Sequence, residues 1–303
     1  MRISVIIPTF KRVDYLKQAL RGLARQRRRA DQIVLGVREG DTSTLELLAS
    51  SPLSLETAPT ADLGVIASMT AAAAKTDGDI VCLLDDDAEP LPDWLEKIEE
   101  HFAREPKLGI VGGRDLLQDH PEMRKHESLL THVGAFTWYG RILGNHHRGG
   151  GTYRQVDLVK GCNAAVRGRL LREIGFDQGL RGNGAQVHWE LALCLNVKNR
   201  GFTVCYDPKL QVIHHIAPRH DMDQIHRGYF SADGLYDMVW NEHHVVAKHA
   251  GSWRSKAHLA WSLLVGSVTA PGIAQYFRLL LTNAPNSSEK LAVTWQAMRD
   301  ARK

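Results

Sequence analysis

The chain has 303 residues, a formal net charge of +4, and 44% hydrophobic and 24% charged residues. This length suits one large domain, or a domain with an appendage, around a full apolar core. The composition is ordinary for a soluble protein. The net charge mildly favours anionic partners such as nucleotide phosphates or acidic lipid, but it is too small to indicate nucleic-acid binding.

The cysteines and the amino terminus indicate a reducing compartment. The four cysteines stand far apart without a CxxC pair. We therefore interpret them as buried thiols and not as a disulfide framework or a zinc site. The first apolar stretch is only five residues long and ends at Pro8, which is too short for a signal peptide. We expect a cytoplasmic protein.

Strand and helix patterns alternate through the first 112 residues. Leu16, Leu20 and Leu23 have helical spacing, and a second helical segment follows Gly64. The apolar runs that predict strands are residues 3–7, 32–37, 80–84 and 108–113, the last closed by its glycines. This alternation predicts an α/β fold with a mostly parallel sheet and right-handed crossovers.

The rest of the chain is mixed at first and then helical. Residues 187–200 predict a helix that Gly201 caps. Strand-like pieces follow at residues 202–206 and 210–213, and the pattern is helical from residue 221 to the end.

Two surface features raise the question of a membrane. Residues 257–282 contain one charged side chain, Arg278, but Pro271 and Gly272 interrupt them, and each half is too short to span a bilayer. An interfacial or subunit-packing helix pair is the prediction, with plain packing on the rest of the chain as the alternative. The cluster of Arg25, Arg27, Arg28 and Arg29 either assists docking to anionic lipid or matches a helix dipole.

Three consecutive acids, Asp85, Asp86 and Asp87, directly follow the apolar run 80–84. In open α/β sheets, ligands bind just beyond the carboxyl ends of the strands. Carboxylates so close together repel one another unless a divalent cation neutralises them, and Mg²⁺ and Mn²⁺ prefer carboxylate oxygens. The alternative is capping of the helix that opens at residues 92–95, although the acids lie several residues before its first turn.

Five segments together resemble a known family. They are VIIPTF (5–10), GDIVCLLDDDAEPLPDWL (78–95), GCNAAVR (161–167), HWELALCLNVKNRGFTVCYDP (188–208) and VIHH (212–215). The chain is similar to family 2 glycosyltransferases with a GT-A fold. This resemblance implies a GT-A catalytic domain over residues 1–219, divided into a nucleotide-binding half (1–112) and an acceptor-binding half (113–219). Residues 220–303 would form a helical C-terminal extension.

The resemblance also implies a metal site. In the family, the last acid of the triplet binds a divalent cation, here Mn²⁺ or Mg²⁺, and an earlier acid contacts the sugar nucleotide. Carried over, Asp87 is the metal ligand, and Asp85 or Asp86 is the sugar-nucleotide contact. A second ligand is expected in a V-x-H position, which His214 occupies. A polar surface histidine is the alternative.

A catalytic base is expected at the start of the helix that ends before Gly201. The family usually places a Glu-Asp pair about eleven residues before such a glycine. Here Glu190 takes the aspartate position and Trp189 replaces the glutamate. Glu190 is the expected general base, with stabilisation of the helix start as its alternative. Trp189 is expected either to stack on a sugar ring or to pack in the core.

Several segments match the family's nucleotide contacts. The turn after the first strand lies against the base and ribose in the family. The family's acidic run after the second strand is replaced by Arg38-Glu39-Gly40-Asp41, which puts uridine in doubt. Asp62, before Gly64, is a ribose or base contact or a helix N-cap. The expected nucleotide-binding residues are Pro8, Thr9, Phe10, Arg12, Glu39, Asp62, Asp85 and Asp86.

Two further residues are expected near the sugar or the acceptor. Asn163 lies in a segment that resembles the family's G-x-N, near the donor sugar, with a turn asparagine as the alternative. Trp138 and its neighbour Tyr139 could line an acceptor groove.

The sequence therefore predicts an inverting, metal-dependent glycosyltransferase that uses a nucleotide-diphosphate sugar. Glycans, lipid-linked molecules and small molecules are the acceptor classes, as in surface polysaccharide, glycolipid or natural-product synthesis. The protein would be cytoplasmic, with peripheral contact at the inner face of the membrane, or a homodimer, through its C-terminal helices. Gln224 and Arg227 have the spacing of a processive-synthase motif but lack its tryptophan, so transfer of one sugar is expected.

Two other function classes compete with this prediction. One is a catalytically inactive nucleotide-binding scaffold, which the missing acid at Trp189 and the altered run at Arg38 favour. The other is a nucleotidyltransferase, which would normally carry a glycine-rich phosphate loop after the first strand. Residues 8–12 contain no glycine, so this class ranks lower.

Overall fold

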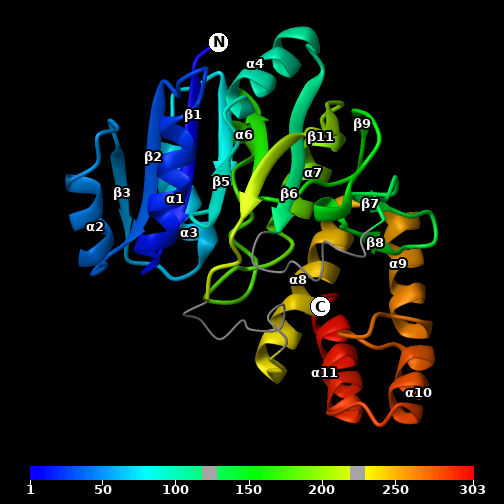
Figure 1. Cartoon of the computed structure of the whole chain (residues 1–303). Coiled ribbons are helices and arrows are strands. Elements are labelled where there is room, and N and C mark those ends of the chain that lie inside the picture. Colours follow the sequence, from blue (N-terminus) through cyan, green and yellow to red (C-terminus); the bar gives the residue numbers. More distant parts are fainter. Residues whose placement is uncertain (118–127, 219–228) are drawn as a thin grey trace.

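The computed structural model describes residues 1–117, 128–218 and 229–303, and its centre is a nine-stranded sheet (Figure 1). The strand order is β3-β2-β1-β4-β10-β6-β11-β5, and β9 pairs with β11. The strands are β1 (Ile3–Thr9), β2 (Gln32–Arg38), β3 (Glu56–Thr60), β4 (Ile80–Leu84), β5 (Ala88–Pro90), β6 (Leu108–Leu117), β9 (Arg154–Gln155), β10 (Asn163–Arg167) and β11 (Thr203–His214).

Most of the large strands run in one direction. β1 is parallel to β2 and β4, and β2 is parallel to β3. β10 is antiparallel to both β4 and β6, and β11 is parallel to β6. The carboxyl ends of β1, β4, β6 and β11 therefore meet at one edge of the sheet. The predicted α/β fold with a mostly parallel sheet is confirmed.

Helices cover both faces of the sheet, so its strands are apolar on both sides. Leu16, Leu20 and Leu23 of α1 pack with Trp94 of α4 and with alternate β1 residues on one face. Ile66 and Met69 of α3 and the apolar side chains of α7 pack on the other face. The helices of this part are α1 (Val13–Ala24), α2 (Thr42–Ala49), α3 (Val65–Ala74), α4 (Trp94–Arg104), α6 (Gly168–Ile174) and α7 (Trp189–Asn199).

Two expectations about strand ends were wrong. β6 does not stop at its glycines but continues to Leu117. Glycine is required there by close packing, since a Cβ on Gly113 would lie 1.8 Å from the carbonyl oxygen of Leu210. The two strand-like pieces at residues 202–213 form the single strand β11, with a register shift between Asp207 and Gln211. α7, in contrast, ends as predicted, because Gly201 follows its cap with φ +80°.

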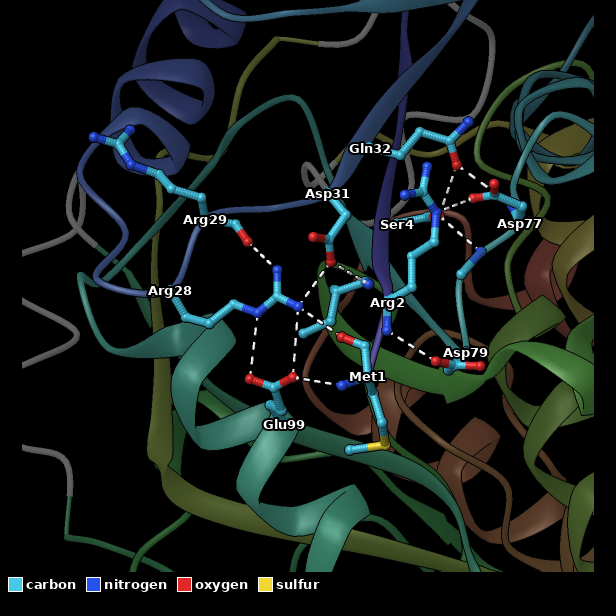
Figure 2. Close-up of polar contacts among 12 residues, drawn as sticks. Met1, Arg2, Ser4, Arg28, Arg29, Asp31, Gln32, Asp77, Asp79 and Glu99 are labelled. Carbon is cyan, nitrogen blue, oxygen red and sulfur yellow. Dashed lines mark hydrogen bonds and ion pairs between the residues drawn. The ribbon is translucent and has the colours of Figure 1, made fainter.

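An ionic network holds the amino ends of the strands, at the edge opposite to the carboxyl ends (Figure 2). Arg28 lies 2.7 Å from Asp31 and 3.3 Å from Glu99, and the terminal ammonium of Met1 lies 3.0 Å from Glu99. Arg25 and Arg27 pair with Glu89 and Glu96. Acids therefore balance three of the four clustered arginines, which leaves this cluster poorly suited to docking on anionic lipid.

The C-terminal helices lie beyond the sheet at one end of the molecule (Figure 1). They have a small apolar cluster of their own, in which Leu235 and Met238 of α8 meet Ala297 and Met298 of α11. The predicted interruption of residues 257–282 is confirmed by the chain between α9 and α10. The helices are α8 (Ala232–His249), α9 (Ser252–Leu264), α10 (Ile273–Leu281) and α11 (Ser287–Asp300).

The helical extension exposes many apolar side chains. Trp253, Leu264, Phe277 and Leu281 are all exposed, and among the described residues Leu281 is the most exposed large hydrophobic side chain. Among the described residues, no helix is both long and apolar enough to cross a membrane. The expected domain boundary at residues 219–220 and the motif-like pair Gln224 and Arg227 lie outside the described residues.

The side chain of Asn163 links α4, β6 and β11 at the centre of the sheet, and its substitution tests whether these hydrogen bonds stabilise the fold. Its side-chain oxygen accepts a hydrogen bond from the Trp94 indole at 2.8 Å, and its amide donates to the carbonyl oxygens of Arg114 and Leu210. We expect Asn163→Ala to lower the free energy of unfolding by about 2–4 kcal/mol, because it leaves these buried groups unpaired. Urea denaturation measures the loss.

Asn199→Ala is the matched control. Asn199 is exposed, and its side-chain amide donates a hydrogen bond to the carbonyl oxygen of His249 at 2.9 Å. Its loss should cost well under about 1 kcal/mol. Equal costs for the two substitutions would contradict the structural role of Asn163.

Candidate active site

A cavity of about 850 Å³ opens at the edge where the carboxyl ends of the strands meet. Its wall combines the end of β1, the acids after β4, the end of β11 and the first turn of α7. Side chains from distant parts of the sequence therefore converge on one space. The predicted residues that line it are Pro8, Thr9, Phe10, Arg12, Asp62, Asp85, Asp86, Asp87, Trp189, Glu190 and His214.

The three acids after β4 have different partners. Asp86 accepts a hydrogen bond from Arg12 at 2.9 Å, and Asp87 accepts one from the backbone N–H of Ala217 at 2.9 Å. Burial, reinforced by the neighbouring Asp87, raises the pKa of Asp85 to about 7. Burial also raises the pKa of Asp86 to about 6, although Arg12 opposes it. Asp85 is therefore the acid of the triplet whose ionised form would be stabilised most by a further positive charge.

Asp87 is held in its ionised form by a histidine. His214 Nε2 lies 3.3 Å from Asp87 Oδ1. Burial alone would raise the pKa of Asp87, but the contact with His214 and the charge of Arg12 hold it below its usual range. The two residues that the sequence predicted as metal ligands thus face each other in the cavity.

Asp115 and Lys160 complete this group. Asp115 on β6 is fully buried, and its Oδ2 lies 3.3 Å from His214 Nδ1 and in contact with Lys160 Nζ. The sequence analysis missed Asp115. The available signal was a charged residue inside an apolar strand, because such a side chain must find a partner when it is buried. Asp115 Oδ1 has no hydrogen-bond partner.

The group fits a divalent cation. His214 offers Nε2 toward Asp87 while Asp115 holds its Nδ1, which is the carboxylate–histidine–metal arrangement of many metal sites. One ligand atom each from Asp85, Cys162 and His214 also lie within 4.8 Å of one another. Burial raises the pKa of the Cys162 thiol well above its usual range. His214 is close to a carboxylate oxygen of Asp85 and, at 3.3 Å, to one of Asp87.

Glu190 and Trp189 open α7 at the cavity. Glu190 Oε1 accepts a long hydrogen bond from the N–H of Gly161 at 3.4 Å, and burial raises the pKa of its carboxyl group. The Trp189 indole packs edge-on to Phe176 and so closely on Gly161 that a Cβ there would lie 2.1 Å from the ring. Trp189 is thus mainly a core residue with one edge at the cavity.

The end of β1 brings an aromatic ring and two cations together. The guanidinium carbon of Arg38 lies 4.7 Å from the centre of the Phe10 ring, and Lys11 Nζ lies 5.2 Å from it. Arg38, the basic residue at the position of an expected acid, itself lines the cavity. Asp41 does not, because it caps α2 and accepts a hydrogen bond from the N–H of Lys11.

Three predicted residues do not line the cavity. Glu39 is exposed beyond the end of β2. Asn163 is fully buried and spends its hydrogen bonds on Trp94 and two carbonyl groups, so it has no free group for a sugar. Trp138 is 77% exposed on the turn between β7 (Ala135–Phe136) and β8 (Ile142–Leu143).

Backbone strain gathers around the cavity. Seven non-glycine residues in the described chain have positive φ, and three of them are asparagines, which tolerate this conformation. The other four are Lys11, Gln186, His188 and Ile216. Each of them lines the cavity or is the chain neighbour of a residue that does. Such conformations persist where the surrounding structure enforces them, commonly at functional sites.

The model of Glycosyl transferase family 2 matches residues 4–175, more than half of the chain. The chain belongs to this family. The match begins in β1, includes the acidic triplet and ends after α6, so it contains the cavity residues of β1 and β4 but not Glu190 or His214. Family membership supports a function in glycosyl transfer.

Two curated proteins are similar to part of this chain. Glucosyl-dolichyl phosphate glucuronosyltransferase of Haloferax volcanii is 27% identical over 159 residues, which are 50% of this chain and 47% of that protein. Uncharacterized protein y4gI of Sinorhizobium fredii is 30% identical over 154 residues, 48% of this chain and 16% of that protein. The matches thus span less than half of each relative.

Solved structures show the same fold. S. aureus TarS 1-349 in complex with UDP-GlcNAc superposes with a TM-score of 0.62 at 13% identity, covering 98% of this chain and 82% of that one. Mannosyltransferase PcManGT from Pyrobaculum calidifontis, in complex with GDP-Man and Mn²⁺, gives a TM-score of 0.56 at 17% identity, covering 99% and 84%. The family's fold, GT-A, is therefore confirmed.

Proposed function

We propose that this protein is an inverting, metal-dependent glycosyltransferase that moves one sugar from a nucleotide-diphosphate sugar to an acceptor hydroxyl. The observation that carries the proposal is the meeting of the acidic triplet, His214 and Glu190 in one cavity. Family membership supports transfer of a sugar. The similar structures named above hold UDP-GlcNAc or GDP-Man, which supports a nucleotide-sugar donor.

The donor would lie between the end of β1 and the acidic triplet. Phe10 offers an aromatic face for the base, and Arg12 and Lys160 bring positive charge to the diphosphate. Asp87 and His214 would hold Mn²⁺ or Mg²⁺, and Asp115 orients His214 through its Nδ1. When bound, such a cation supplies Lewis-acid stabilisation of the departing diphosphate.

Glu190 is the proposed general base. Burial raises the pKa of its carboxyl group, which makes the carboxylate a better proton acceptor than an exposed one. It would take the proton of the acceptor hydroxyl as the oxygen attacks the anomeric carbon and the diphosphate leaves from the opposite side. Single displacement inverts the anomeric centre. The first turn of α7 places this group at the wall of the cavity.

The proposed domains are an acceptor-binding half over residues 113–219 and a helical extension over residues 220–303, of which the structure describes 113–117, 128–218 and 229–303. Glycans, lipid-linked molecules and small molecules remain the proposed acceptor classes. Trp189 has only an edge at the cavity, so stacking on a sugar would engage that edge. Trp138 lies outside the cavity, so a contact with the acceptor would need an acceptor that extends along the surface to β7 and β8.

The metal site is tested by Asp87→Asn. Calorimetry with a panel of nucleoside diphosphates and nucleotide sugars, with Mn²⁺ or with a chelator, first identifies the ligand. We expect binding to the parent protein to strengthen with Mn²⁺. Asp87→Asn should lose at least about tenfold of that affinity, equivalent to ~1.4 kcal/mol, because one charged ligand is gone.

Asp14→Asn is the control for this measurement, because Asp14 pairs only with Lys17 on the surface of α1. It should retain the affinity of the parent protein. Tight binding of a nucleotide that is indifferent to both metal and Asp87 would remove Asp87 and His214 as ligands.

The base is tested by Glu190→Gln, which keeps the shape of the side chain and removes its basicity. We expect turnover to fall by about 10²–10⁴-fold with donor affinity unchanged. Because the pKa of Glu190 is raised, the rate of the parent protein should fall as the pH drops through that pKa, and more alkaline conditions should restore it. Chromatography of the released product measures turnover and its dependence on pH.

Glu173→Gln, on the exposed surface of α6, is the matched control and should retain full turnover. A near-normal rate for Glu190→Gln would show that the base lies elsewhere. A parent protein that binds nucleotide sugar but turns over no acceptor would favour the inactive scaffold.

The C-terminal helices are proposed to contact an anionic lipid surface. Residues 252–303 carry seven basic and two acidic side chains beside the exposed apolar side chains of α9 and α10. Phe277 and Leu281 lie on one face of α10 and are both exposed. Replacing both with serine should lower partition onto vesicles containing phosphatidylglycerol by about tenfold or more.

Leu45→Ser, at an exposed position on α2, is the control and should leave partition unchanged. Flotation of the parent protein with neutral vesicles tests the role of charge. Absence of binding, together with a dimer in analytical ultracentrifugation that the α10 substitutions dissociate, would assign this surface to a second copy instead.

A further inference from the structure

A second group of metal-ligand side chains lies outside the cavity, between α8 and α9. One ligand atom each from Glu242, His243 and His258 lies within 4.8 Å of the others. Glu242 Oε1 is 3.3 Å from His258 Nε2, and the rings of His243 and His258 have their centres 4.5 Å apart. Glu242 and His243 are neighbours on α8, and their side chains point in different directions. His258 of α9 lies against both side chains and so completes the group.

The two histidines carry buried nitrogen atoms without a well-formed hydrogen bond, and His258 Nε2 has only its ion-pair contact with Glu242. His243 is 2% exposed and His258 is 0% exposed. His243 Nδ1 and His258 Nε2 have no hydrogen-bond partner, even though Glu242 lies near the latter. A buried polar atom without a partner costs about 1–3 kcal/mol, so two in one group require an explanation.

His258 is oriented like a metal ligand. Its Nδ1 lies 2.7 Å from the carbonyl oxygen of Gly140, which can only accept, so Nδ1 carries a proton. In the neutral ring the free electron pair is then on Nε2, which faces Glu242. A histidine that donates through one nitrogen to a carbonyl and offers the other is the usual form of a metal ligand. Gly140 lies on the turn between β7 and β8, so this turn positions the ring.

The surroundings favour a neutral ring at His243 and an ionised carboxylate at Glu242, whereas Glu242 favours a proton on His258. Burial lowers the pKa of His243 to about 3, so its ring is neutral. Burial also lowers the pKa of His258, but Glu242 outweighs it and raises the value. Arg302 is the nearby positive charge that opposes a cation. The competing arrangement is a proton on His258 Nε2 shared with Glu242, which leaves His243 Nδ1 unsatisfied.

We infer that Glu242, His243 and His258 form a second metal site, for a transition-metal dication such as Zn²⁺. Two imidazoles and one carboxylate are a donor set of zinc sites, whereas Mg²⁺ and Mn²⁺ prefer oxygen ligands. This chemistry differs from that of the Asp87 cavity, so the two sites should select different metals. The inference does not depend on the proposed glycosyl transfer.

The position of the site suggests what it does. His188 Nε2 lies 3.4 Å from Glu242 Oε2, and His188 is the residue before α7, with φ +76°. Trp189 and Glu190 follow it directly. A metal held by α8 and α9 would therefore fix Glu242 and, through His188, the first turn of α7. The helical extension would thus be fastened to the part of the chain that carries the proposed base.

Cobalt and zinc binding test the site. The full chain is stripped with a chelator and titrated with Co²⁺, whose visible absorption reports nitrogen ligands and tetrahedral geometry, and Zn²⁺ is then added as a competitor. We expect one such site in the parent protein and in Asp87→Asn, which lacks the proposed catalytic ligand. His243→Gln and Glu242→Gln should weaken Zn²⁺ binding by at least about tenfold.

His244→Gln is the matched control. His244 is the next residue on α8, but it stacks on Trp240 and faces Asp177 at 3.6 Å. It should bind Co²⁺ and Zn²⁺ like the parent protein. Thermal melting with and without Zn²⁺ gives an independent readout, in which Zn²⁺ should raise the melting temperature of Asp87→Asn but not that of Glu242→Gln.

Two outcomes would overturn the inference. One is the absence of a nitrogen-ligated cobalt spectrum in Asp87→Asn, a measurement that needs no change in the second site. The other is unchanged Zn²⁺ affinity in a folded His243→Gln or Glu242→Gln protein. Either result would assign the group to the proton-sharing arrangement.

Discussion

Buried negative charge at the end of β4 is the constraint on which the site depends. Three carboxylates follow an apolar strand, and each must be balanced or protonated where water is scarce. Arg12 from the end of β1 meets Asp86, and His214 from the end of β11 meets Asp87. Asp115 from β6 and Lys160 extend the balance to the middle of the sheet. Five distant segments are thus held together by one requirement for electrical neutrality, and a cation would complete it.

Glu190 stands apart from this ionic group, and that separation suits two different tasks. Asp87, near His214 and Arg12, is arranged to hold charge, as its low pKa indicates. Burial does the opposite to Glu190 and favours its proton. Carboxyl groups whose surroundings push their pKa values apart are typical of sites that use one as a ligand and another as an acid or base. The strained residues Gln186 and His188 lie four and two residues before Glu190, so the backbone leading into α7 is held by its neighbours.

The helical extension is connected to the cavity through α8. Asn241 donates to the carbonyl oxygens of Arg181 and Val187, and the next residue, Glu242, faces His188. The extension therefore contacts the segment that leads into α7 at several points. Its own apolar cluster is small, and many of its large side chains are exposed. A metal between α8 and α9 would stabilise an element that its limited core supports weakly.

The sequence by itself determined the strands β1, β2, β4 and β6, the two parts of β11, the helices α1, α3, α4 and α7, the family resemblance and eleven of the residues that line the cavity. Uninterrupted apolar runs such as Ile80–Leu84, and the acids after them, are local patterns that can be recognised without knowledge of the fold. Which side chains contact each other was decided only by the tertiary structure. Asp115, Arg38 and the unsatisfied nitrogens of His243 and His258 acquire meaning from side chains that are distant in sequence. Asn163 shows the converse, because its motif suggested a ligand contact and its position inside the sheet gave its hydrogen bonds to Trp94 and the backbone.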